Sequence, residues 1–305
     1  MPTQTLNGKT VLVTGAGGGI GRAIALMAAE HGANVVVNDI GASLSGASES
    51  TDAAAAVVNE IKAAGGQAMA SRANVADAKA TQDMVDDAIA KFGRLDAIVN
   101  NAGILRDGFF HKMTPEDFEA VIRVHLMGSF NVSRAAAEQF RKQNSGSCVH
   151  MTSTSGLIGN LAQANYSAAK LGIVGLSKSI ALDMQRFGVR SNCIAPFAWS
   201  RMTSSIKVDS AEQEVRVAKL KEMKGEKVAA LAIYLASDAA AGVSGQIFAS
   251  RNNEIMLMGQ SRPLRTVHRD GGWNTETIAE HGMPALQASF YPLEVSADVL
   301  SWDPV

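Results

Sequence analysis

Tyr166 and Lys170 lie four residues apart in a stretch rich in helix formers, so both fall on one helical face. A free tyrosine has a pKa of about 10, and a neighbouring cation favours the phenolate and lowers that pKa. A phenol whose pKa is near neutrality can take a proton from an alcohol or return one to a ketone. A Tyr-x-x-x-Lys spacing alone is more often a solvated surface pair, so the rest of the sequence has to decide between the two interpretations.

A glycine-rich loop, Thr14-Gly-Ala-Gly-Gly-Gly-Ile-Gly21, joins a short β-branched run to a helical pattern. Glycines at such a junction permit a tight turn and bring backbone N–H groups close to a pyrophosphate. The loop follows a predicted strand and precedes a second strand that ends in an acid, which is the context of a dinucleotide site. We therefore predict a dinucleotide site with these residues: Gly15, Gly18, Gly19, Ile20 and Gly21.

Asp39 ends the second predicted strand, where a carboxylate can accept hydrogen bonds from the adenosine ribose hydroxyls. The same charge would repel the 2′-phosphate of NADP. No Arg or Lys lies within the glycine loop or just after Asp39 to compensate. Asp39 could instead cap a turn, but its position favours the ribose role. We predict NAD as the cofactor.

The elements that must position these residues alternate regularly along the chain. Strand-like runs cover 9–14, 33–39, 67–71, 95–99, 147–152, 189–195 and 245–249. Helical patterns cover 20–31, 51–64, 77–92, 115–143, 165–187 and 226–236, with Thr114 as the N-cap of the long one. This alternation predicts a doubly wound α/β fold (Rossmann fold), a parallel sheet with helices on both faces.

The sequence predicts a single dinucleotide-binding and catalytic domain at 1–259, because no linker rich in Pro or Ser divides it. Residues 260–305 form a C-terminal extension with little periodicity and two of the three tryptophans. We expect this extension to pack on the domain, given its aromatic and apolar residues.

The net charge of -1 gives no electrostatic footprint for nucleic acid or an anionic membrane. No apolar run reaches about 18 residues, so we expect no membrane span. The polar first residues lack the apolar core of a signal peptide, and we expect a cytoplasmic enzyme. The six histidines show no metal-ligand spacing, so we predict no metal site.

Three further motifs strengthen the functional interpretation of Tyr166 and Lys170. The glycine spacing, Asn101-Ala-Gly103 after the fourth strand, and Ser153 ahead of Tyr166 together resemble the short-chain dehydrogenase/reductase family over roughly residues 6–250. The resemblance implies that Tyr166 is the general acid/base and that Ser153 holds the substrate oxygen. It implies that Lys170 binds the nicotinamide ribose and lowers the Tyr166 pKa.

The same resemblance assigns further residues to the cofactor groove: Asn74, Val75, Asn101, Ala102, Gly103, Tyr166, Lys170, Pro196 and Ala198. Three positions depart from the family pattern. Asn74 stands where an aspartate often contacts adenine, and Phe197 replaces a glycine. His125 stands where an asparagine commonly supports a proton-relay water, so we treat His125 as a candidate either for positioning that water or for helix packing.

A narrower resemblance is to the (3R)-hydroxyacyl-CoA dehydrogenase module of the peroxisomal multifunctional β-oxidation enzymes, through the stretches 101–107, 123–130 and 159–172. It implies NAD-dependent oxidation of a 3-hydroxyacyl-CoA, with a bulky or steroid-derived acyl group as one option. The alternatives are a 3-oxoacyl reductase or a hydroxysteroid dehydrogenase, and a non-catalytic NAD-sensing protein. The family resemblance also implies a homodimer or homotetramer, and only the dehydrogenase unit is expected in this chain.

Overall fold

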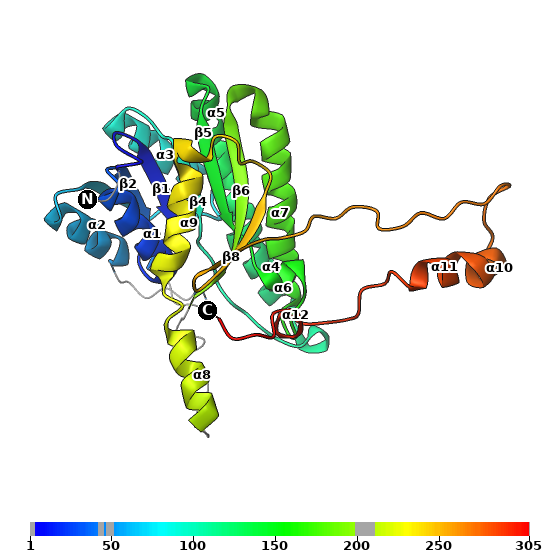
Figure 1. Ribbon diagram of the computed structural model, residues 1–305. Helices are drawn as coiled ribbons and strands as arrows, with labels where there is room; N and C mark the ends of the chain where they lie inside the picture. The colour runs from blue at the N-terminus through cyan, green and yellow to red at the C-terminus, as the bar shows by residue number, and fades with distance from the viewer. Residues whose placement is uncertain (1–3, 42–45, 47–51, 199–210, 305) are drawn as a thin grey trace.

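The computed structural model describes residues 4–41, 46, 52–198 and 211–304. An eight-stranded sheet in the order β3-β2-β1-β4-β5-β6-β7-β8 forms its centre (Figure 1). All neighbouring strands are parallel except β7 and β8, which are antiparallel. The strands are β1 (Thr10–Thr14), β2 (Asn34–Asn38), β3 (Gln67–Ser71), β4 (Ala97–Asn100), β5 (Gly146–Met151), β6 (Val189–Phe197), β7 (Ile247–Arg251) and β8 (Glu254–Leu257). The predicted doubly wound sheet is confirmed.

Two helical layers cover the sheet, each packed through its own core of small and branched apolar side chains. The layer on one face consists of α1 (Gly19–Glu30), α2 (Ala53–Ala63) and α9 (Gly225–Ala236). The layer on the other face consists of α3 (Ala78–Phe92), α5 (Gly128–Gln143) and α7 (Ala164–Met184). Buried strands such as β1 and β5 carry no exposed face, which explains their continuous runs of buried residues.

One predicted helix is divided in the structure. The pattern over 115–143 predicted a single helix, but α4 (Pro115–Ile122) and α5 are joined by a π-helical turn, Arg123–Met127. Thr114 caps α4 as predicted, since its hydroxyl accepts from the Asp117 N–H at 3.2 Å. The π turn contains His125, whose ring is buried against the chain that follows β4. Such turns often mark functional positions.

Several further elements were absent from the sequence prediction. The last strand is β8, which follows β7 in a hairpin, so the prediction that the sheet ends at 245–249 was wrong. The other elements are short or lie beside residues outside the described part: α6 (Thr154–Leu157), α8 (Ala211–Lys221), the 3-10 turn η1 (Phe110–Lys112), α10 (Thr275–Thr277), α11 (Met283–Gln287) and α12 (Ser296–Val299). No helix within the described residues is long and apolar enough to cross a membrane.

Among the described residues, the hydrogen bonds between the C-terminal extension and the body lie near the two ends of the extension. Gln260 donates to the Gly245 carbonyl at 2.8 Å, and the Ser296 N–H donates to the Gly159 carbonyl at 2.9 Å. The Trp302 indole donates to Glu254 at 2.6 Å. Between these anchors the chain leads away from the body to α10 and α11 and back again (Figure 1). We expected the whole extension to pack on the domain, whereas its middle part projects into solvent.

Candidate active site

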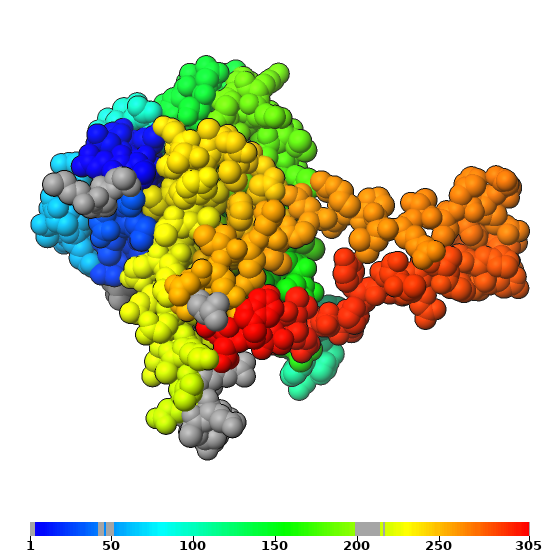
Figure 2. Space-filling view, viewed as in Figure 1, coloured from blue at the N-terminus to red at the C-terminus, as the bar shows by residue number. Residues whose placement is uncertain are grey.

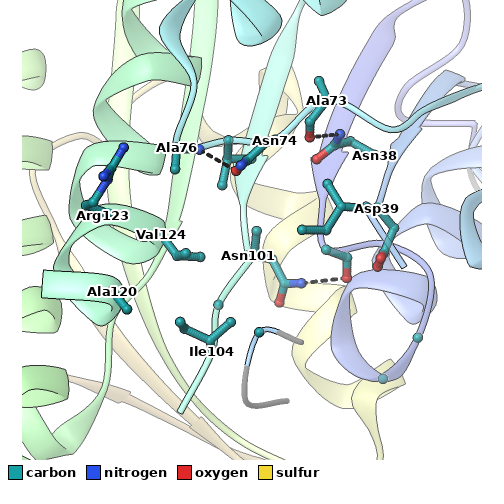
Figure 3. A pocket seen from close by; sticks show the side chains of 18 of the residues that line it. Asn38, Asp39, Ala73, Asn74, Ala76, Asn101, Ile104, Ala120, Arg123 and Val124 are labelled. Atoms are coloured by element: carbon teal, nitrogen blue, oxygen red, sulfur yellow. Dashed lines mark hydrogen bonds between the residues drawn. The ribbon is translucent and has the colours of Figure 1, made fainter. Parts of the chain in front are cut away.

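A cavity of about 630 Å³ lies at the carboxyl ends of the strands, where the strand order reverses between β1 and β4 (Figure 3). Parallel doubly wound sheets bind ligands at this switch point. The following residues line it: Gly15, Gly18, Gly19, Asn38, Asp39, Ile40, Gly46, Ala73, Asn74, Val75, Ala76, Asn101, Ala102, Gly103, Ile104, Arg106, Ala120, Arg123 and Val124. Most of the predicted cofactor residues are therefore brought together.

The glycines of the loop fall into two groups by the space around them. A Cβ on Gly21 would lie 2.2 Å from the Gly15 carbonyl oxygen, so Gly21 allows α1 to pack closely on the loop. Gly15 has φ +62°, which favours glycine, and a Cβ there would lie 2.8 Å from the Ala102 Cα. Gly18 and Gly19 have open space beside them, at the start of α1. This arrangement leaves a bare backbone at a helix N-terminus, where phosphate groups bind.

Asp39 lines the cavity and also fixes the loop around it. One carboxylate oxygen accepts from the Gly17 N–H at 2.9 Å, and the other accepts from the Gly41 N–H at 2.8 Å. Each oxygen keeps a further lone pair. The turn-capping and ribose-binding interpretations of Asp39 are thus compatible in one geometry. Asp39 and Arg123 stand on opposite walls in Figure 3.

Asn101 joins the glycine loop to the end of β4. Its side-chain amide donates to the carbonyls of Thr14 and Gly15, each at 3.0 Å. The Thr14 hydroxyl accepts from the N–H groups of Asn101 and Ala102. Asn101 therefore holds the groove's floor together, and Thr14 has a positioning role that the sequence analysis missed. Its position as the last residue before the glycine loop was the available signal.

Ser153, Tyr166 and Lys170 meet beside this cavity, at the end of β5 and on the first turns of α7. The Ser153 hydroxyl donates to the Ser155 hydroxyl at 3.1 Å, and its proximity to the Tyr166 phenol acts to lower the Tyr166 pKa. The Lys170 ammonium lies 5.4 Å from the centre of the Tyr166 ring. Ile104, which lines the cavity, packs against Tyr166 and so links the three residues to the cofactor groove.

Burial dominates the acid–base properties of this cluster. It raises the pKa of Tyr166, with Asp107 adding to the effect. Burial also lowers the pKa of Lys170 to about 7. The Lys170 ammonium donates to the Met151 carbonyl at 2.6 Å rather than to the phenol. The expected lowering of the Tyr166 pKa by Lys170 is therefore not seen, because the buried lysine holds its charge weakly and points elsewhere.

The buried His125 ring packs against the Tyr166 ring. Its ring meets the Tyr166 ring edge to face, with centres 5.3 Å apart, and its Nε2 lies 2.8 Å from the Ile104 carbonyl. A Cβ on Gly103 would come within 2.3 Å of the His125 ring, so Gly103 makes room for it. Burial and the nearby Lys170 lower the His125 pKa to about 3, so the ring is neutral. Its Nδ1 is buried without a partner among the described residues.

Six predicted cofactor residues lie outside the cavity lining: Ile20, Gly21, Tyr166, Lys170, Pro196 and Ala198. Ile20 lies in the first turn of α1, next to the loop. Pro196 of β6 pairs with Ser250 of β7, and Ala198 packs on the core beyond β6. The sequence analysis also missed lining residues on the wall from α4 and the chain after β4: Ile104, Arg106, Ala120, Arg123 and Val124. No local pattern marked them, because tertiary packing decides which side chains of these segments face the cavity.

Comparison with known proteins decides the family. The family profile described as short chain dehydrogenase matches residues 9–214, which is more than half of the chain. The chain belongs to the short-chain dehydrogenase family. It is therefore a nicotinamide-dependent oxidoreductase, with NAD or NADP as the cofactor.

The chain is 45% identical over 229 residues to the peroxisomal multifunctional enzyme type 2 of Mus musculus, covering 75% of this chain and 30% of that protein. The chain thus spans less than a third of this relative. It is 41% identical over 240 residues to a 3-oxoacyl-(acyl-carrier-protein) reductase of Staphylococcus aureus, covering 78% of this chain and 94% of that protein. The sequence-based resemblance to the multifunctional enzymes is confirmed.

A solved short-chain dehydrogenase from Mycobacterium avium superimposes with a TM-score of 0.82 and 37% identity. The match covers 95% of this chain and 98% of that chain. The two proteins therefore share this fold over nearly their whole lengths.

The residues present fit a nicotinamide dinucleotide. The backbone of Gly18 and Gly19 is open to the cavity at a helix N-terminus, where pyrophosphate binds. Asp39 offers carboxylate oxygens where an adenosine ribose is held. Tyr166 and Lys170 lie beyond Ile104, next to the same cavity.

Proposed function

We propose that this short-chain dehydrogenase oxidises the secondary alcohol of a 3-hydroxyacyl-CoA to a ketone, with NAD as its cofactor. The observation that carries the proposal is the meeting of Ser153, Tyr166 and Lys170 beside a dinucleotide-sized groove at the switch point of the sheet. Bound NAD supplies the hydride acceptor.

Side chains of this protein would orient the substrate, transfer the proton and bind the cofactor. Ser153 donates a hydrogen bond to the substrate oxygen and holds the hydroxyl against Tyr166. Tyr166 takes the hydroxyl proton as general base. Lys170 is placed to bind the nicotinamide ribose, and its ammonium favours the tyrosinate once it points toward that groove. His125 and Ile104 keep the Tyr166 ring in one orientation.

NAD is proposed over NADP because Asp39 places a carboxylate at the adenosine end of the groove and no Arg or Lys closely follows it in the chain. Asp39 lines the cavity, and residues 40–61 contain no Arg or Lys. Arg22 on α1 is engaged with Glu60. A 2′-phosphate at Asp39 would therefore meet a like charge without compensation.

The acyl-CoA substrate is proposed from the similarity to the multifunctional enzymes. The test is a panel of 3-hydroxyacyl-CoA thioesters of increasing acyl size, the matching free 3-hydroxy acids, and simple secondary and steroid alcohols. NAD reduction should be fastest with a thioester. Turnover confined to alcohols without a thioester would contradict the substrate, while leaving the dehydrogenase chemistry in place.

A second candidate is the reverse reaction, reduction of a 3-oxoacyl thioester. The similarity to the Staphylococcus aureus reductase, which spans 94% of that protein, favours it. The ratio of kcat/KM for NADPH-dependent reduction to that for NAD-dependent oxidation separates the two. A ratio well above one, with a 3-oxoacyl thioester and NADPH, would support the reductase.

A further inference from the structure

The Ser153 hydroxyl is connected to polar side chains that have no part in the reaction described above. It donates to the Ser155 hydroxyl, and its oxygen accepts from the Ser155 N–H, each at 3.1 Å. The Ser155 hydroxyl donates in turn to the Gln163 side-chain carbonyl at 2.9 Å. The Gln163 amide then donates to the Asp107 carboxylate at 2.9 Å. These four side chains are here called the Asp107 network, and they connect the catalytic serine to a carboxylate.

Asp107 fixes the direction of every hydrogen bond in this network. A carboxylate only accepts, so the Gln163 NH₂ group must face Asp107 and the Gln163 carbonyl must face Ser155. Each hydroxyl has one hydrogen. Because the Ser155 hydrogen is committed to Gln163, the Ser155 oxygen can only accept from Ser153. Asn160 also donates to that oxygen, at 2.9 Å, and completes its hydrogen bonds.

The backbone holds the two outer members of the network side by side. The Gly108 N–H donates to the Ala162 carbonyl at 2.8 Å, and Gly108 forms an isolated β-bridge with Gln163. Ala162 has φ +60°, a left-handed conformation that is unfavourable for a residue with a Cβ. Such conformations persist where the surrounding structure fixes them, and they cluster at functional sites. This turn places Gln163 as the N-cap residue of α7, three residues before Tyr166.

The outer end of the network carries a charge. Asp107 is exposed in the segment that follows β4, and this blue-green segment reaches the molecular surface in Figure 2. Burial raises the pKa of Tyr166, and the Asp107 carboxylate raises it further. The other titratable groups against Tyr166 in the described part of the chain are Lys170 on its own helix and His125 in the π turn. Arg106, next to Asp107, is ion-paired with α4.

We propose that Gln163, anchored by Asp107, is a positioning residue for Ser153 in the oxidation of the alcohol. Through Ser155 it holds the Ser153 oxygen in place, so the Ser153 hydrogen turns from Ser155 to the substrate oxygen without a shift of its own oxygen. Ser155 keeps Asn160 and Gln163 as partners during this turn, so no buried hydroxyl is left unsatisfied. This role rests on the proposed function of Ser153, whichever alcohol is the substrate.

A double-mutant cycle tests whether Gln163 acts through Ser153. Gln163→Met keeps the side-chain length but removes its hydrogen bonds, and kcat should fall about 10–100-fold with NAD affinity unchanged. In a Ser153→Ala background the same change should lower kcat less than about threefold, because the positioned group is already absent. An equal fall in both backgrounds, or wild-type kcat in Gln163→Met, would overturn the proposal. Gln185→Met, at the other end of α7, is the matched control and should keep wild-type kcat.

Asp107→Asn separates the anchor from its charge. The amide oxygen can still accept from Gln163, so the network stays in place while the carboxylate is lost. The Tyr166 pKa should then fall, measured without turnover as the ultraviolet difference between Asp107→Asn with and without Tyr166→Phe. Because oxidation needs the tyrosinate, the rise of kcat/KM with pH should move to lower pH. An unchanged Tyr166 pKa would contradict the role of Asp107.

The proposed function and the Asp107 network fail in different ways. The cycle uses whichever alcohol the wild type oxidises fastest, so a wrong acyl-CoA assignment leaves it intact. If the wild type oxidises no alcohol with NAD, the proposed function fails, and the titration of Tyr166 in Asp107→Asn still tests the network. Circular dichroism checks that each variant folds.

Discussion

At the scale of residues, burial sets the properties of Tyr166 and Lys170 before a cofactor binds. Burial raises the pKa of the phenol and lowers that of the ammonium to about 7, so each group is shifted toward its neutral form. Base catalysis by Tyr166 then needs a positive charge in the groove, which oxidised nicotinamide supplies when bound. Sequence spacing identified the pair, whereas the direction in which Lys170 points depends on the Met151 carbonyl and was not predictable.

The first prediction is that NAD lowers the Tyr166 pKa. The chain has three tyrosines, so the ultraviolet difference between wild type and Tyr166→Phe isolates this phenol. Its pKa should be raised without cofactor and lower with NAD. Alcohol oxidation needs the tyrosinate, so kcat/KM should rise with pH up to that pKa, and ketone reduction should fall. A Tyr166 pKa that NAD leaves unchanged would count against this account.

The second prediction concerns Asp39. Asp39→Asn keeps an acceptor oxygen for the Gly17 or Gly41 N–H but removes the charge. The ratio of NADP to NAD affinity should rise at least about tenfold, since a like-charge repulsion is removed. This ratio is measured by titrating the enzyme with each reduced cofactor and following the cofactor fluorescence. Asp52→Asn, outside the cavity lining, is the control, and an equal ratio in both variants would contradict the role of Asp39.

At the scale of elements, the alternation of strands and helices was predictable because each pattern reflects local burial. The division of 115–143 was not, since the π turn places His125 against Gly103 and Ile104, a tertiary contact that no local pattern reports. Strand β8 was missed because Ile255 and Leu257 are exposed and break the usual alternation. The glycine loop was recognised, but its division into packing and open glycines needed the structure.

The third prediction separates the two kinds of glycine. Gly21→Ala places a Cβ against the Gly15 carbonyl and should destabilise the fold by about 1–3 kcal/mol. Gly18→Ala places a Cβ in the open cavity, so the free energy of unfolding should change by under about 1 kcal/mol. NAD affinity should nevertheless fall at least about tenfold in Gly18→Ala, because the helix N-terminus is then screened. Urea unfolding and NAD titration give the two readouts, and wild-type NAD affinity in Gly18→Ala would contradict the assignment.

At the scale of the whole molecule, the carboxyl ends of the strands carry the cofactor groove and the catalytic residues, and the C-terminal extension returns to the body near them, at Gly159 (Figure 1). The sequence showed that residues 260–305 are apolar enough to be buried. It gave no sign that the middle of this segment projects from the described part of the body, because that depends on tertiary packing. The fold and its catalytic cluster can thus be predicted from local pattern, whereas the course of the C-terminal extension cannot.

The central claim is that Tyr166 performs the proton transfer of an NAD-linked oxidation. The measurement is the initial rate of NADH formation with saturating NAD and 3-hydroxyacyl-CoA in wild type and in Tyr166→Phe, beside NAD affinity for both. The account predicts a fall in kcat of about 10²–10⁴-fold in the variant with NAD affinity retained. Turnover by Tyr166→Phe within a few-fold of wild type would contradict it.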